Sequence, residues 1–68
     1  MTFPEKLKDL RKSRNLKQKE VAEAINLTVN AISNYEQGLR EPSLTVLKDI
    51  CLFFDVSADY LVGITDEY

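Results

Sequence analysis

The stretch from Gln18 to Gly38 restricts the possible folds of this chain more than any other part, because two short amphipathic segments follow one another there almost without a gap. The apolar side chains that recur at helical spacing in the two segments are Val21, Ala22, Ile25, Ile32 and Tyr35. Only three residues, 26–28, separate the segments. Two helices joined by so short a turn cannot lie antiparallel, so we expect them to cross at a steep angle.

Helical spacing and capping residues divide the whole chain into five helices. Hydroxyl residues suited to the N-cap position precede four of them, and the two glycines, Gly38 and Gly63, follow helix ends. We expect helices at about residues 3–14, 18–25, 29–37, 44–54 and 58–62. The fourth has a broad apolar face made of Leu44, Leu47, Ile50, Cys51 and Phe54. No strand pattern competes, so the sequence predicts a compact all-α fold in one domain, residues 1–68.

Composition narrows the class of protein. Of the 68 residues 44% are hydrophobic, and no apolar run approaches the roughly 18 residues of a membrane-spanning helix. No targeting segment precedes the first expected helix, so we expect a small soluble domain in the cytoplasm. One cysteine, Cys51, and no histidine exclude an internal disulfide and give no recognisable zinc site. Cys51 has no base partner and there is no glycine-rich phosphate loop, so we expect neither an enzyme nor a cofactor.

Charge is distributed unevenly along the chain. The net charge is −2, but residues 1–40 hold eight Lys or Arg against five acidic residues, whereas residues 41–68 hold only Lys48 against six. The two parts therefore carry charges of +3 and −5. A domain of this kind can present its basic end to phosphates, although the same distribution also fits ordinary surface charge.

Two charged residues fall on the apolar faces of their helices. Arg11 lies four residues after Leu7, and Glu36 lies four residues after Ile32. A buried charge without a partner is costly, so we expect Arg11 and Glu36 to form an ion pair that fastens the first helix to the third. The alternative is that both side chains extend to water.

The second amphipathic segment also carries a polar stripe. Asn30 and Asn34 are four residues apart, as are Val29 and Ser33, which places these four side chains on one face away from Ile32. Two amides, a hydroxyl and a branched methyl pair are suited to contact base edges in a DNA groove.

The residues that precede and follow this stripe resemble a known family. Over nearly its whole length the chain resembles the XRE, or Cro and repressor-type, helix-turn-helix domains. The landmarks are Leu10-Arg11-Lys12, Gln18, Val21-Ala22, Ile32-Ser33-Asn34-Tyr35-Glu36, Gly38, Glu41-Pro42-Ser43 and Asp59-Tyr60-Leu61. The resemblance implies a lambda-repressor-like five-helix fold, with the helix-turn-helix at about residues 18–37 and the third helix as the recognition helix. It also implies the ion pair between Arg11 and Glu36.

The resemblance assigns roles by position. It implies that Gln18 binds a backbone phosphate, and that the base-facing residues are Val29, Asn30, Ser33 and Asn34. Either asparagine can pair with adenine in bidentate fashion, Val29 can pack on a thymine methyl and Ser33 is permissive, so we expect a half-site containing A·T pairs. The expected phosphate contacts are Lys17, Gln18, Lys19 and Arg40, with Arg14 as a weaker candidate, although the basic residues are also compatible with solvated surface charge.

Two positions differ from the usual family pattern. Lys17 stands where the family often has Thr or Ser, so it cannot cap the second helix with a hydroxyl. Asn26 stands where the turn often has Gly, and asparagine tolerates the left-handed backbone that such a turn needs.

We therefore expect a sequence-specific transcriptional regulator, a repressor that binds double-stranded DNA as a homodimer on a palindromic operator, without a membrane or a small-molecule ligand. Apolar residues of the C-terminal half that could form the dimer contact are Leu52, Phe53, Tyr60 and Val62, which could equally complete the core. The alternative function is a protein-interaction module, such as an antitoxin or a partner-sequestering regulator, that works through the acidic C-terminal half.

Overall fold

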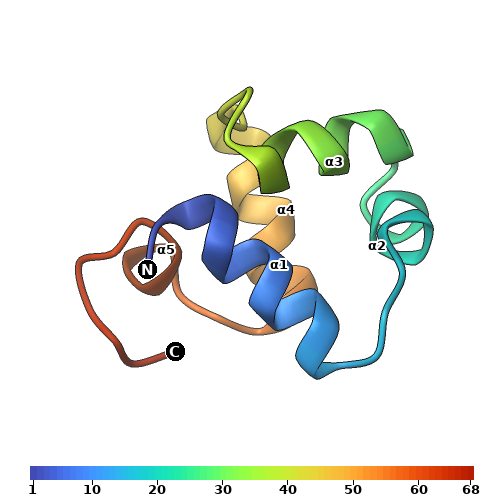
Figure 1. The fold of residues 1–68 in the computed structure, drawn as a ribbon. Coiled ribbons are helices and arrows are strands. Elements are labelled where there is room, and N and C mark those ends of the chain that lie inside the picture. The colour runs from blue at the N-terminus through green and yellow to red at the C-terminus, as the bar shows by residue number, and fades with distance from the viewer.

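The computed structural model describes all 68 residues and contains five α-helices and no strand. Their bounds are α1 Phe3–Ser13, α2 Gln18–Ala24, α3 Val29–Gln37, α4 Leu44–Phe54 and α5 Ala58–Leu61. Figure 1 shows α3 lying across α1, with α2 at one end of α3 and α4 behind both. The N-terminus lies beside α5. None of the helices has the length and apolar character needed to cross a membrane. The predicted all-α, five-helix fold is confirmed.

Side-chain caps explain where several of these helices begin and end. The hydroxyls of Thr28, Ser43 and Ser57 accept hydrogen bonds from the backbone N–H three residues later, at 3.1, 3.2 and 3.0 Å. At the other end of α3, Gly38 has a φ of 75°, the left-handed conformation that glycine adopts without strain. The capping residues therefore fix the length of α3 at both ends.

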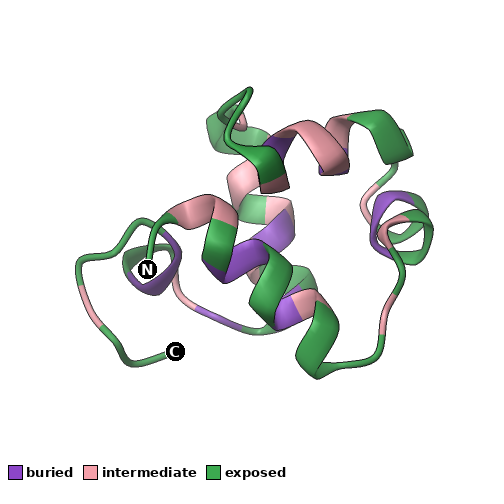
Figure 2. Cartoon of the chain, in the orientation of Figure 1, coloured by how far each residue is buried: buried purple, intermediate pink, exposed green.

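The core is a single cluster in which all five helices take part. Its members are Leu7, Leu10, Val21, Ala22, Ile32, Tyr35, Ile50, Phe54, Val56, Tyr60 and Leu61. Figure 2 shows these buried positions on the inward sides of the helices, with exposed residues at both ends of α3 and intermediate ones between them. Because α3 packs against both α1 and α2, its outer face is held in a fixed direction.

The sequence prediction was wrong about one apolar residue of α4. Leu44 was assigned to the apolar face of α4, but its side chain is 85% exposed. It is the first residue of α4 and lies beside the open surface near Val62, where no other helix covers it. Helix α2 ends at Ala24 because Ile25 leaves the helical conformation as its C-cap.

A buried lysine was not predicted. Lys6 of α1 is only 3% exposed, and its Nζ donates a hydrogen bond of 2.6 Å to the carbonyl oxygen of Tyr60. The same ammonium lies 4.4 Å from the centre of the Tyr60 ring, so it also makes a cation–π contact. The C-terminal residues return to this point, where the Tyr68 ring meets the Tyr60 ring edge to face at 4.8 Å. Lys6 thus connects α1 to α5 and the end of the chain.

Candidate nucleic-acid interface

The polar stripe of α3 lies on the outside of the molecule. Val29 is 42% exposed and Asn30 is exposed, whereas Ser33 and Asn34 are half-buried. Ile32, on the opposite side of the helix, is fully buried in the core. The structure therefore brings the four predicted base-facing residues together on one accessible surface, with the N-terminal end of the helix the most open.

The turn before α3 adopts the backbone that the sequence predicted. Asn26 has a φ of 60°, in the left-handed region that asparagine tolerates better than most residues. The backbone N–H of Leu27 then donates to the carbonyl of Ala22 at 2.8 Å, which closes the end of α2. The four-residue connection, residues 25–28, thus turns the chain sharply from α2 into α3, as Figure 1 shows.

Arg11 and Glu36 meet between α1 and α3, close to the start of α2. The Arg11 Nε donates to Glu36 Oε2 at 2.7 Å and its Nη2 donates to Glu36 Oε1 at 2.9 Å, a bidentate pair. The exposed fractions of the two side chains are 11% and 3%. The third contact of the guanidinium, from Nη1 to the Leu16 carbonyl at 2.9 Å, ties the loop between α1 and α2 to the pair. The hydrogen bond to Glu36 raises the pKa of Arg11, which favours the charged form of the guanidinium.

Gln18 joins the same network from the first position of α2. Its Nε2 donates to Glu36 Oε1 at 3.2 Å, and its side chain is half-buried. An amide nitrogen carries two hydrogens, so the second remains available to a phosphate oxygen near the start of α2. The contact with Glu36 orients this amide, and it was not predicted from the sequence.

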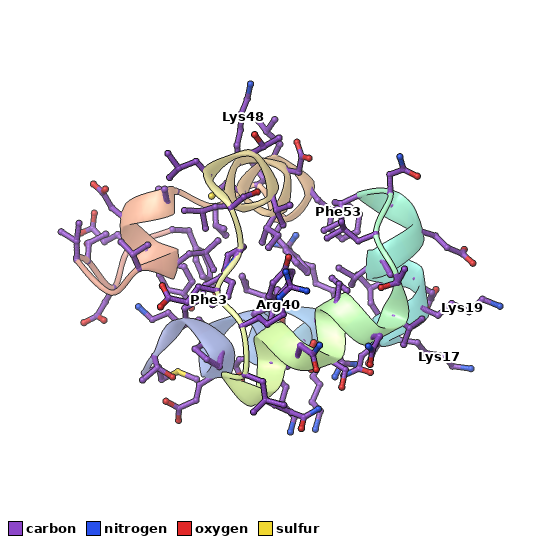
Figure 3. The ribbon with its side chains drawn as sticks, turned by 90° about the horizontal axis from the view of Figure 1, so that it is seen from above. Phe3, Lys17, Lys19, Arg40, Lys48 and Phe53 are labelled. Atoms are coloured by element: carbon purple, nitrogen blue, oxygen red, sulfur yellow. The ribbon has the colours of Figure 1, made fainter.

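The N-terminal end of α2 lacks a hydroxyl cap, and a carboxylate takes part of its place. Glu20 Oε1 accepts the backbone N–H of Lys17 at 2.8 Å. The side chains of Lys17 and Lys19 are exposed and project away from the body of the protein at the α2 end, as Figure 3 shows. Both ammonium groups are therefore free to approach a backbone phosphate.

The two arginines named as phosphate contacts occupy different surroundings. Arg40 is exposed in the loop between α3 and α4, which Figure 3 shows passing across the end of α3. The guanidinium of Arg14 lies 5.3 Å from the centre of the Phe54 ring, on the side of α1 that meets α4. This cation–π contact gives Arg14 a structural partner and separates it from the lysines of α2.

One residue of the stripe was missed. Gln37, the last residue of α3, is exposed, and its Nε2 donates to Ser33 Oγ at 2.7 Å. The signal was present in the sequence, because Gln37 comes four residues after Ser33 and seven after Asn30 and so lies on the same face.

Two open grooves with apolar walls lie away from the stripe. The first, called here the terminal groove, has a volume of about 590 Å³ and lies between the start of α1, the loop before α4 and the end of α5. Its apolar residues are Phe3, Leu44, Leu47 and Val62, and Arg40 and Glu41 also line it. The second, the α2–α4 groove, has a volume of about 460 Å³ and is lined by Ala24, Ile25, Asn26, Asp49, Leu52 and Phe53. Figure 3 shows Phe53 between α4 and α2.

The four apolar residues proposed for a dimer contact are divided between these places. Val62 lines the terminal groove and is 53% exposed, whereas Leu52 and Phe53 line the α2–α4 groove and are 69% and 37% exposed. Tyr60 is only 7% exposed, so the prediction that it is available for such a contact was wrong. Its ring is covered by Lys6 and Tyr68.

Neither the thiol nor the acidic residues form a chemical site. Burial raises the pKa of the Cys51 thiol, which disfavours the reactive thiolate. No cluster of three or more His, Cys, Asp or Glu side chains has an arrangement that could hold a metal ion.

Comparisons with known proteins agree with this geometry. A family profile described as Helix-turn-helix matches residues 7–61. The HTH-type transcriptional regulator ImmR of Bacillus subtilis (strain 168) is 38% identical over 63 residues, 93% of this chain and 50% of ImmR. The antitoxin PezA of Streptococcus pneumoniae serotype 4 is 37% identical over 57 residues, 84% of this chain and 36% of PezA. The chain thus spans half or less of the length of these curated relatives.

A solved structure shows the same fold. The P22 c2 repressor protein, determined in complex with a synthetic operator, superimposes with a TM-score of 0.87 over 91% of this chain and 94% of that chain. The two sequences are 24% identical, so this similarity concerns the fold.

Proposed function

This chain belongs to the XRE-type helix-turn-helix family, and from that premise we propose that it binds double-stranded DNA sequence-specifically as a transcriptional regulator. The observation that supports this most is the exposed stripe of α3, held in direction by the bidentate pair of Arg11 with Glu36 and by Gln18. A helix presented in this way fits the major groove of B-DNA, where its first residues reach the base edges.

The side chains of the stripe define the proposed base contacts. Asn30 is exposed and pairs with the N6 and N7 atoms of an adenine, and Asn34 makes the same pairing one helical turn further on. Val29 packs on a thymine methyl group. With no Arg or Lys on this face, direct recognition of guanine by a bidentate cation is absent, so the half-site contains A·T pairs.

The proposed phosphate contacts surround the stripe. Lys17, Lys19 and the second N–H of the Gln18 amide bind the backbone at the α2 end, and Arg40 binds it beside the C-terminal end of α3. The Glu20 carboxylate accepts a hydrogen bond from the Lys17 backbone N–H and places a negative charge at the same helix end. The positive charges of the two lysines must outweigh this negative charge for a phosphate to bind there. Such contacts fix the orientation of the protein on DNA without reading sequence.

We further propose that the protein acts as a repressor in the form of a homodimer on a palindromic operator. One copy presents only one recognition helix, and two-fold pairing places two of them about 34 Å apart, in successive turns of the major groove on one side of the DNA. The domain measures 28 × 23 × 19 Å, which allows two copies to lie side by side at that spacing. The terminal groove is our candidate interface, because the apolar side chains of Leu44 and Val62 on its wall are 85% and 53% exposed and can pack against the same side chains of a second copy.

The second candidate function is that of an antitoxin or a regulator that sequesters a protein partner. It is supported by the similarity to PezA and by the exposed Leu52 and Phe53 of the α2–α4 groove. A protein with this function alone has no need of a stripe of amides beside two free lysines, which is why we place it second.

Selection of bound sites from random double-stranded DNA tests the leading proposal. We expect enrichment of a site with A·T pairs, and a steep fall of affinity with salt because phosphate contacts release counterions. Asn30→Ala is expected to lower discrimination at one base pair by about 1 to 3 kcal/mol, whereas Lys17→Ala weakens binding to all sequences alike.

Lys48→Ala serves as the control, because Lys48 is exposed on α4 and Figure 3 shows it pointing away from the α2 lysines. This variant should leave both affinity and sequence preference unchanged. Failure of the wild-type protein to bind DNA even at low salt would favour the protein-partner function.

A further inference from the structure

The hydrogen bond between Gln37 and Ser33 gives the hydroxyl in the middle of the stripe a defined polarity. A serine hydroxyl has one hydrogen to donate and two lone pairs to accept with, and it normally rotates to suit its surroundings. Here Ser33 Oγ accepts from Gln37 Nε2 at 2.7 Å, so one lone pair is already in use.

The hydrogen of this hydroxyl has no partner within the protein. Serine in a helix often donates to the carbonyl of the preceding turn, and Ser13 does so in this chain, from its Oγ to the Leu10 carbonyl at 2.9 Å. Ser33 makes no such bond; its side chain takes part only in the contact with Gln37. Accepting a hydrogen bond also polarises the O–H group and makes it a better donor.

Gln37 is placed to keep this arrangement in a DNA groove. It is exposed, it lies one turn beyond Ser33, and its amide retains a second N–H and a carbonyl oxygen after bonding to Ser33. The stripe from Val29 to Gln37 extends for about 12 Å along the helix axis, close to the rise of three to four base pairs. The pair therefore lies within the length of DNA that α3 can span.

We propose that Gln37 is a specificity-determining residue, which holds Ser33 as a hydrogen-bond donor and so makes it select a base with an acceptor in the major groove. Guanine presents N7 and O6, adenine N7 and thymine O4, whereas cytosine presents only the N4 donor. Ser33 then discriminates against cytosine at its base pair instead of accepting any base. This inference rests on the proposed binding of DNA by α3.

The test compares the affinity for four duplexes that differ at one base pair, at each position of the selected half-site and at constant salt. The proteins are the wild type, Ser33→Ala, Gln37→Met, the double variant, and Gln37→Glu. Methionine preserves the length and helix propensity of Gln37 but cannot donate to Ser33. Gln37 is exposed and Ser33→Ala removes only a hydroxyl from a half-buried position, so we expect all of these variants to fold, which circular dichroism verifies.

Ser33→Ala and Gln37→Met should reduce discrimination against cytosine at the same base pair by about three- to tenfold, a part of what a full bidentate contact provides. The double variant should lose no more discrimination against cytosine than Ser33→Ala alone, because both changes remove the same hydrogen-bonded pair. In Gln37→Glu the carboxylate accepts a hydrogen bond from the Ser33 hydroxyl. Ser33 then offers only lone pairs to the DNA, so the preference at that base pair should move towards cytosine.

The inference is overturned if Gln37→Met leaves every base preference as in the wild type, or changes a base pair that Ser33→Ala does not affect. In either case the wild type and Asn30→Ala still report on the proposed function, which stands if Asn30→Ala loses discrimination at its own base pair. A wild-type protein without any sequence preference overturns both proposals together.

Discussion

At the scale of single residues, Glu36 holds α3 in its direction relative to α1 and α2. Its carboxylate accepts two hydrogen bonds from Arg11 and one from Gln18, and its side chain is 3% exposed. In Glu36→Ala the Arg11 guanidinium loses its counter-charge while remaining largely buried. We expect a loss of about 3 to 5 kcal/mol in the free energy of unfolding, measured by urea denaturation.

Glu23→Ala provides the control, because Glu23 is an exposed acid of α2 with no ion pair and its removal should change stability by less than about 0.5 kcal/mol. If Glu36→Ala proves no more harmful than Glu23→Ala, the ion pair does not hold α1 and α3 together.

The sequence reveals residues of this kind only when both partners carry a recognisable signal. Arg11 and Glu36 each follow an apolar residue at helical spacing, and their opposite charges indicate the pairing. Lys6 gave no such signal, because its partner is the backbone carbonyl of Tyr60. Every residue has a backbone carbonyl, so the sequence cannot single this one out. The contact between Gln18 and Glu36 could not be predicted either, since it depends on how closely α2 approaches α3.

At the scale of helices, the start of α2 shows a conflict between stability and binding. Lys17 occupies the N-cap position without a hydroxyl, and the capping carboxylate of Glu20 satisfies only the Lys17 N–H. Lys17→Thr would add a hydroxyl that accepts the Glu20 backbone N–H, which we expect to raise the free energy of unfolding by about 0.5 to 1 kcal/mol. The same change removes the charge that we propose to contact a phosphate, so we expect weaker DNA binding at every sequence and a shallower salt dependence.

Lys19→Thr distinguishes the two effects. Lys19 is equally exposed but lies within α2, so threonine there should weaken DNA binding without any gain in stability. A Lys17→Thr variant that gains stability and binds DNA as tightly as the wild type would exclude Lys17 from the phosphate contacts.

The helix boundaries were the features of this structure that the sequence predicted best. Thr28, Ser43 and Ser57 cap their helices through the bonds that their hydroxyls predict, and Gly38 ends α3. Leu44 shows where this reasoning fails, because helical spacing identifies an apolar face but not whether another element covers its first residue. Gln37 was left out of the stripe although its spacing from Ser33 places it on the same face, whereas its bond to Ser33 depends on a side-chain rotamer and could not be predicted.

At the scale of the whole molecule, some of the apolar side chains outside the core line two separate grooves. The sequence left open whether the apolar residues of the C-terminal half complete the core, and the packing of the helices buries Tyr60 but leaves Leu52, Phe53 and Val62 exposed. Residues close in sequence, such as Phe53 and Val62, line different grooves, while Phe3 joins Val62 from the other end of the chain. One of these surfaces must be covered if the protein binds DNA as a homodimer.

A negative charge introduced on one groove at a time tests which of the two grooves forms the dimer interface. Leu44 is 85% exposed and Leu52 is 69% exposed, so glutamate at either position should cost little stability. In a dimer formed through the terminal groove, Leu44→Glu brings two carboxylates together across the two-fold axis. We expect it to bind a single half-site as the wild type does but to lose about tenfold or more of the affinity for a duplex with two half-sites, whereas Leu52→Glu behaves as the wild type. The reverse result would move the interface to the α2–α4 groove, and wild-type protein that sediments as a monomer on the two-half-site duplex would contradict the dimer itself.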